Sequence, residues 1–213
     1  MLPNDTQRLA IVGRTGSGKT QAAVWHLSNR SFNKKPWIIY DFKYDKLINE
    51  IKGLQEITLD EIPTKPGLYI VHPLPDDQEK VEAHLWAVWA KENIGVFIDE
   101  GYMIGNSKAF RALLTQGRSK HIPMIILSQR PSWISRFVFS EADFYQVFWL
   151  NDIRDRKIVG AFVPFDMHEK LKNYHSIYFD VGNDEIYEWQ PVPDKRQILA
   201  TFDRKLDTRP KFI

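Results

Sequence analysis

Short apolar runs alternate with segments of helical periodicity along most of the chain. Buried strands are predicted at residues 8–12, 37–42, 68–71, 94–98, 123–128 and 146–150. Helices are predicted at residues 18–28, 78–91, 108–115 and 155–162, where apolar side chains recur every three or four positions. Strands that alternate with helices are typical of an α/β fold, so we expect a mostly parallel sheet flanked by helices.

A β-hairpin is predicted near the carboxyl end of the chain. Two strand patterns, residues 176–181 and 185–190, are joined by Gly182, Asn183 and Asp184, which favour a tight turn. The 213 residues, of which 43% are hydrophobic and 26% charged, fit one compact domain. We therefore expect a single domain over residues 1–213, with its core at about 8–160 and the hairpin and tail at about 174–213.

Composition and charge exclude several classes of protein and of binding surface. It has no cysteine, which excludes disulfides and thiolate metal sites and fits a reducing environment. The amino-terminal residues lack a signal-peptide pattern, and every apolar run is far shorter than the roughly 18 residues of a membrane span. The net charge of +2 excludes a uniformly basic surface for nucleic acid, although basic residues cluster at 118–136, 154–157 and 195–211. We expect a soluble protein with no transmembrane segment of its own.

A glycine-rich loop follows the first predicted strand and precedes the first predicted helix. Its eight residues match the pattern G-x-x-x-x-G-K-[ST] and are Gly13, Arg14, Thr15, Gly16, Ser17, Gly18, Lys19 and Thr20. Glycines let this backbone turn tightly, so that its N–H groups are directed at phosphate oxygens. Lys19 supplies a positive charge to the β- and γ-phosphates, and the Thr20 hydroxyl can ligate Mg²⁺. The pattern therefore predicts a P-loop that binds ATP and Mg²⁺.

Two carboxylates end the predicted strand at 94–98. Asp99 is expected to hold Mg²⁺ through water, and Glu100 to polarise the attacking water as general base. A glutamate beside the aspartate favours a RecA-like ATPase, which hydrolyses ATP with its own base, over a small-molecule kinase. The alternative interpretation is a strand end that carries solubilising charges.

A polar turn, residues 128–131, follows the predicted strand at 123–128. Gln129 stands at the carboxyl end of that strand, from where its amide could reach the γ-phosphate or the attacking water. A turn with ordinary turn chemistry explains these residues equally well.

The order of these segments resembles the FtsK–HerA superfamily of DNA-pumping ATPases over about residues 8–159. The resemblance rests on the P-loop, residues 98–100, the turn at 128–131 and the basic run at 117–122 that precedes it. Asp41 and Lys43 resemble the D-x-K element of that superfamily, and Arg156 falls at a family arginine. The basic run ends in a histidine where the family has a glycine. The short chain is most similar to the genome-packaging ATPases of icosahedral viruses with an internal membrane.

This resemblance implies a homo-oligomeric ring, with a hexamer as the expected size, around double-stranded DNA. Arg118 would act on the ATP of a neighbouring subunit, with Lys120 as the alternative. Residues 101–111 are the candidate pore loop, with Lys108 and Arg111 as DNA contacts or, equally well, as a solvated helix face. The resemblance also implies work in the virion or host cytoplasm, at the periphery of a viral membrane, with capsid vertex or membrane proteins as partners.

Three other functions compete with genome packaging. The first is another DNA pump of the same superfamily or a phage-assembly ATPase, which normally carries a membrane span. The others are a small-molecule kinase and a regulatory nucleotide switch, both disfavoured by Glu100. An apolar cluster at residues 133–139, around Arg136, has two interpretations, either packing under the sheet or a docking surface.

Overall fold

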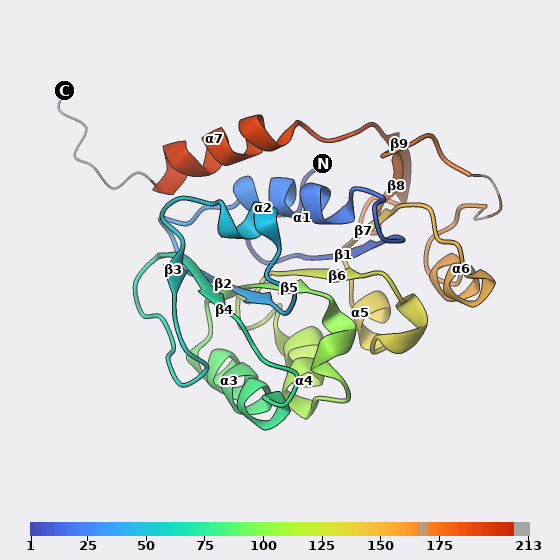
Figure 1. The fold of residues 1–213 in the computed structure, drawn as a ribbon. Coiled ribbons are helices and arrows are strands. Elements are labelled where there is room, and N and C mark those ends of the chain that lie inside the picture. The colour runs from blue at the N-terminus through green and yellow to red at the C-terminus, as the bar shows by residue number, and fades with distance from the viewer. Residues whose placement is uncertain (167, 169, 207–213) are drawn as a thin grey trace.

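The computed structural model describes residues 1–166, 168 and 170–206, and these residues form one nine-stranded sheet with helices on both faces (Figure 1). The strands are β1 Arg8–Val12, β2 Pro36–Asp41, β3 Gln55–Glu56, β4 Gly67–Val71, β5 Gly95–Asp99, β6 Met124–Ser128, β7 Phe144–Val147, β8 Ser176–Asp180 and β9 Glu185–Trp189. The helices are α1 Lys19–Ser28, α2 Lys46–Asn49, α3 Gln78–Lys91, α4 Lys108–Gln116, α5 Phe137–Ser140, α6 Ile153–Gly160 and α7 Lys195–Leu206. Two short 3₁₀ helices, η1 Gly101–Ile104 and η2 Pro131–Trp133, follow β5 and β6.

The strands lie in the order β3-β4-β2-β5-β6-β1-β7-β8-β9. The strands from β3 to β7 in this order are parallel, whereas β8 and β9 are antiparallel to their neighbours. The central strands are buried along their whole length because helices cover both faces. The predicted α/β fold, mostly parallel sheet and carboxyl-terminal hairpin are therefore confirmed, and the hairpin continues the sheet beyond β7.

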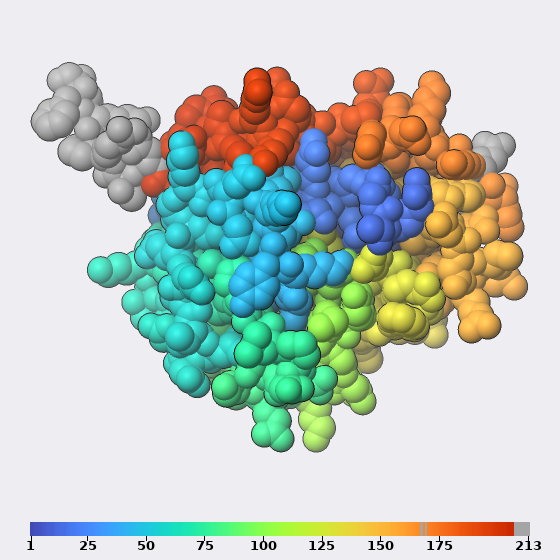
Figure 2. All heavy atoms as spheres, in the orientation of Figure 1, coloured from blue at the N-terminus to red at the C-terminus, as the bar shows by residue number. Residues whose placement is uncertain are grey.

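Each face of the sheet has its own hydrophobic core. On one face, α1 and α2 contribute Ala22, Leu27 and Ile48, and α7 adds Ile198 and Phe202. On the other face, helices α3 to α6 cover the sheet with apolar residues that include Leu85, Phe110, Leu113, Phe139 and Val159. The side chains of α7 form the upper border of the molecule in Figure 2, next to those of α1 and α2.

The structure changes several predicted element boundaries. β7 begins at Phe144, two residues before the predicted start, and ends at Val147, directly before the hydrogen bond that Phe148 N donates to Val12 O. α6 begins at Ile153 because Asp152 accepts a hydrogen bond from the N–H of Arg154 at its amino end. The helix α7 was not predicted, since its residues were interpreted only as a basic tail, although two apolar side chains four residues apart bury one face of this helix.

The sheet order brings three strand ends together. β6 lies between β1 and β5 and pairs with both in parallel, with Val12 beside Ser128 and Ile98 beside Ile126. The carboxyl ends of these strands therefore meet at one edge of the sheet, where ligands of open α/β sheets bind. None of the helices among the described residues is both long and apolar enough to cross a membrane.

Candidate nucleotide site

The P-loop residues connect β1 to α1 at this edge. Gly16 and Gly18 have φ values of 74° and 95°, a left-handed conformation that glycine adopts without strain. At Gly13 there is no room for a side chain, because a Cβ would lie 2.6 Å from both Phe148 Cβ and Ser17 Oγ. The loop is fixed to its neighbours by hydrogen bonds from Gly13 N to Ser128 O (3.3 Å) and from Arg14 N to Trp149 O (3.0 Å). This geometry places a tight backbone turn before the amino end of α1, which is a favourable place for an anion.

Lys19 and Thr20 occupy the first two positions of α1. Lys19 is buried, and its Nζ lies 3.6 Å from Glu100 Oε1, whereas Thr20 is half-buried. The buried hydroxyl of Ser17 has no hydrogen-bond partner among the described residues. A buried cation and an unpartnered hydroxyl in one loop fit a phosphate group, which would accept hydrogen bonds from both.

Asp99 ends β5 directly beside Asp41 at the end of β2. Its side chain is buried, and its Oδ1 has no hydrogen-bond partner among the residues described. Burial and, to a smaller extent, the negative charge of Glu100 together raise the pKa of this carboxyl to about 7. A buried carboxylate with a free oxygen is a ligand that fits Mg²⁺, whose charge would favour the ionised form.

Glu100 is fully buried and has a φ of 65°, which is unusual for a residue other than glycine. Its Oε1 forms ion pairs with Lys43 and Lys19, and its Oε2 accepts a hydrogen bond from Gln129 N (3.3 Å). A strained backbone that is held by several partners is typical of functional sites. The predicted acidic pair, Asp99 and Glu100, thus lies at the carboxyl end of β5, with Glu100 held next to Lys19 of the P-loop.

Lys43 belongs to the D-x-K element of the family resemblance, and the structure brings its side chain to Glu100. The loop that carries Lys43 is organised by the buried Asp41, which accepts hydrogen bonds from Lys43 N (3.2 Å), Asp45 N (3.0 Å) and Asn49 Nδ2 (2.9 Å). In the sequence, Lys43 is recognisable only as part of a charged turn directly after a strand. Its contact with Glu100 becomes predictable only once β2 is known to lie beside β5.

Gln129 lies where the sequence placed it, at the carboxyl end of β6 between the P-loop and the acidic pair. Its side-chain oxygen accepts a hydrogen bond from the hydroxyl of Thr15. Its backbone N–H binds Glu100, so one residue contacts both halves of the site.

Arg118 is not near the P-loop of its own chain. It lies between α4 and β6, on the side where the strands begin, and its Nη2 is 3.6 Å from Asp143 Oδ1. Asp143 in turn accepts a hydrogen bond from Arg8 N at the start of β1, 2.8 Å away. The Arg118 side chain is 63% exposed. Arg118 therefore occupies the sheet edge opposite the nucleotide site.

The alternative candidate, Lys120, is engaged within the chain. Its Nζ lies 2.6 Å from Glu92 Oε1 and 3.8 Å from the ring centroid of Trp89. This pairing leaves Arg118 as the better candidate for a contact with another subunit.

The apolar residues at 133–139 divide into two groups. Ile134, Val138 and Phe139 are buried, as the packing interpretation predicts, whereas Trp133 and Phe137 are exposed. Both exposed rings contact the segment after β5, since Trp133 packs edge-on against Tyr102 and Phe137 lies under the guanidinium of Arg111. Lys108 and Arg111 of the candidate pore loop are exposed.

Comparisons with known proteins give the following likenesses. No model of a protein family matches the chain. The chain is 52% identical over 214 residues to the DNA packaging ATPase P9 of Enterobacteria phage PRD1, which covers 95% of this chain and 94% of the phage protein.

Solved structures share the fold. One is the genome packaging NTPase B204 of Sulfolobus turreted icosahedral virus 2 in complex with ATPγS, with a TM-score of 0.71, 19% identity and coverage of 90% of this chain and 100% of B204. Another is the cytoplasmic domain of the type VII secretion ATPase EccC of Thermomonospora curvata, with a TM-score of 0.63 and 11% identity over 97% of this chain and 28% of EccC.

The relative at 52% identity spans nearly the whole of both chains. The predicted likeness to small viral packaging ATPases is thereby confirmed. The chain belongs to the family of phage DNA packaging ATPases that includes P9 of phage PRD1.

Proposed function

We propose that the chain is an ATP-hydrolysing translocase that packages viral double-stranded DNA into a capsid. The observation that carries the proposal is the buried pair Asp99 and Glu100, held beside the P-loop with Glu100 Oε1 3.6 Å from Lys19 Nζ. This pair supplies a metal ligand and a base at the same strand end. Membership of a family named for DNA packaging supports DNA as the substrate.

Each site residue has a role in this proposal. Residues 13–20 bind the triphosphate through their backbone N–H groups, and Lys19 neutralises its β- and γ-phosphates. Thr20 and Asp99 hold Mg²⁺, which offsets negative charge on the phosphates. Glu100 takes the proton of the attacking water, and Gln129 positions that water from the end of β6.

The location of Arg118 supports a head-to-tail ring. This residue lies at the edge opposite its own nucleotide site, so any nucleotide that it contacts would be bound by a neighbouring subunit. An arginine supplied in trans contributes about 10³ to 10⁵ in rate where it has been measured. We propose a closed ring, with a hexamer as the size that the superfamily resemblance implies.

DNA is proposed to pass through the centre of the ring and to contact residues 101–111. Lys108 and Arg111 are exposed in this segment, which follows β5 directly and therefore starts beside Glu100. Contacts to phosphates carry little sequence information and weaken steeply with salt. Capsid vertex or membrane proteins are the proposed docking partners, in the virion or the host cytoplasm.

The rate of ATP hydrolysis tests this proposal when it is measured across protein concentrations, with and without double-stranded DNA. Turnover per subunit should rise with concentration, because sites form between subunits, and rise again with DNA. Glu100→Gln removes the base and should lower turnover by at least about 10², while it preserves the size of the side chain. Turnover that depends on neither concentration nor DNA would contradict the proposal and favour a kinase, for which a phosphate acceptor would then be sought.

A further inference from the structure

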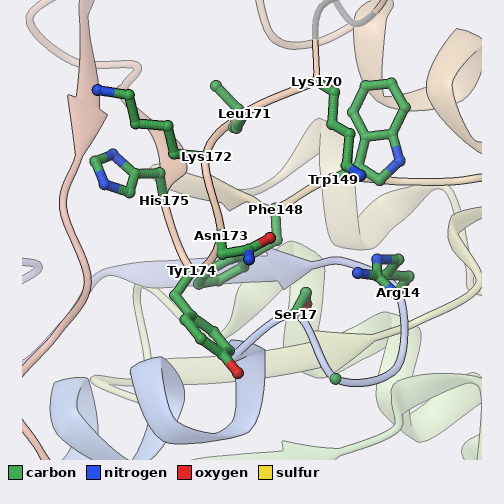
Figure 3. Close-up of a pocket in the computed structure, with 11 residues that line it drawn as sticks. Arg14, Ser17, Phe148, Trp149, Lys170, Leu171, Lys172, Asn173, Tyr174 and His175 are labelled. Carbon is green, nitrogen blue, oxygen red and sulfur yellow. The ribbon is translucent and has the colours of Figure 1, made fainter.

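A hollow with a cavity volume of about 140 Å³, open to solvent, lies beside the P-loop on its β7 side (Figure 3). Arg14 and Ser17 of the loop form one wall, and Phe148 and Trp149, which follow β7, form another. Residues 170–175, which precede β8, close the third side.

The arrangement of the site fixes which end of a nucleotide points toward this hollow. The reacting end of the triphosphate belongs on the side of β6 and β5, where Lys19 approaches Glu100 and Thr15 binds Gln129. β7 flanks β1 on the other side. A triphosphate held in the loop therefore directs its nucleoside toward β7 and the hollow.

A second cavity next to the loop is less suitable for the nucleoside. It is lined by Asp152 and Asp155, and Arg130 there lies within 3.6 Å of both carboxylates. Negative groups repel the adjoining α-phosphate. The hollow beside β7 instead has no carboxylate among its lining residues, and Lys170 beside Trp149 would attract it (Figure 3).

Tyr174 is the most unusual residue of the hollow. It is 59% exposed, and its φ of 63° is left-handed. Its ring lies against the loop, since Tyr174 Cδ1 would be 3.1 Å from a Cβ placed on Gly18. The segment is held in place by its neighbour His175, whose Nδ1 is 2.9 Å from Glu188 Oε1 on β9. A strained aromatic residue that is exposed beside a phosphate loop indicates a ligand contact.

We propose that Tyr174 and residues 170–173 form the nucleoside subsite, in which the Tyr174 ring stacks on the base of the bound nucleotide. This inference rests on the proposed function, because it needs a triphosphate in the P-loop. Stacking recognises the face of a base and not its hydrogen-bonding edge, so it tolerates different bases. The subsite accordingly accepts both adenine and guanine nucleotides.

Binding of ADP and of inorganic tripolyphosphate, each with Mg²⁺, separates the nucleoside contact from the phosphate contact. Both are titrated calorimetrically into the full chain as wild type, Tyr174→Ala and Tyr174→Phe. Tyr174→Ala should bind ADP roughly 5- to 150-fold more weakly, as expected for the loss of one stacked base, and tripolyphosphate within about twofold of wild type. Tyr174→Phe keeps the ring and should bind ADP as wild type does. Tyr187→Ala, at an exposed tyrosine of β9 away from the hollow, is the matched control.

Two results would overturn the subsite. One is unchanged ADP affinity in Tyr174→Ala, and the other is an equal loss of ADP and tripolyphosphate binding, which would indicate damage to the loop. A wild-type protein that binds neither compound would contradict the proposed function itself, and the inference with it.

Discussion

The surroundings of Asp99 determine both the pKa of its carboxyl and its capacity to bind a cation. Its carboxyl is buried at a strand end, next to Glu100 and in register with Asp41, and these surroundings raise its pKa to about 7. A carboxylate in this position costs free energy until a cation compensates it. The ion pairs of Lys43 and Lys19 are made with Glu100, so the charge of Asp99 remains available to a metal.

The raised pKa of Asp99 predicts a pH-dependent stability of the nucleotide-free protein. Between the usual value of about 4 and about 7, the folded state keeps a proton that the unfolded state releases, so the stability contributed by this group falls as pH rises through that window. Asp99→Asn removes this dependence. We expect the melting temperature of the variant to exceed that of wild type by more at pH 8 than at pH 5. In unfolding free energy, the effect of the substitution should differ between the two pH values by roughly 2 kcal/mol.

Thermal unfolding at the two pH values checks this prediction. Added Mg²⁺ with ADP should raise the melting temperature of the wild type at pH 8 and have little effect on the variant. If the melting temperature of Asp99→Asn exceeded that of wild type by the same amount at pH 5 and at pH 8, the prediction would be contradicted, because the pKa of Asp99 would then be normal.

At the scale of elements, the sequence predicted the features that local chemistry determines. Residues 13–20 and the pair Asp99 and Glu100 were found because each motif is contiguous and lies at the end of an apolar strand. Gln129 was found for the same reason. Strand order was not predictable in this way, because it depends on which strands pair across the sheet.

Residues that join the site through tertiary structure were harder to recognise. Lys43 reaches Glu100 only because β2 pairs with β5, and Tyr174 reaches Gly18 from a segment far along the chain. The helix α7 was not predicted, although apolar residues at 198, 199, 202 and 206 have helical spacing, because the charged residues between them were interpreted only as a basic tail.

The connection between α4 and β6 leads to a prediction about Arg118. Arg118→Ala and Glu100→Gln should each lower ATP turnover by at least about 10² when alone, because each removes one half of a shared site. Mixed rings should regain activity, since about one interface in four pairs an intact Glu100 with an intact Arg118. Turnover of the mixed proteins checks this expectation, with Lys120→Ala as a control that removes a neighbouring cation already paired with Glu92. Activity that is only the sum of the two variants would place Arg118 outside the nucleotide site.

At the scale of the whole molecule, the edge of the sheet where the strands end and the edge where they begin carry different functional residues. The edge where the strands end carries the P-loop, Glu100 and the candidate pore loop at 101–111, and the edge where they begin carries Arg118. Under the proposed function, a subunit built in this way is incomplete alone, and a ring would supply each site with an arginine from its neighbour. In the same proposal, ATP hydrolysis and DNA contact would share one strand end, so that hydrolysis at Glu100 would move the segment that follows it.

Displacement of a third strand from linear double-stranded DNA tests this account most directly, because it detects movement along DNA and not merely stimulated hydrolysis. With ATP and Mg²⁺, the wild type should release a labelled third strand at a rate that falls with salt, while Glu100→Gln should release none. The account would be contradicted if the wild type hydrolysed ATP in the presence of DNA and left the third strand in place.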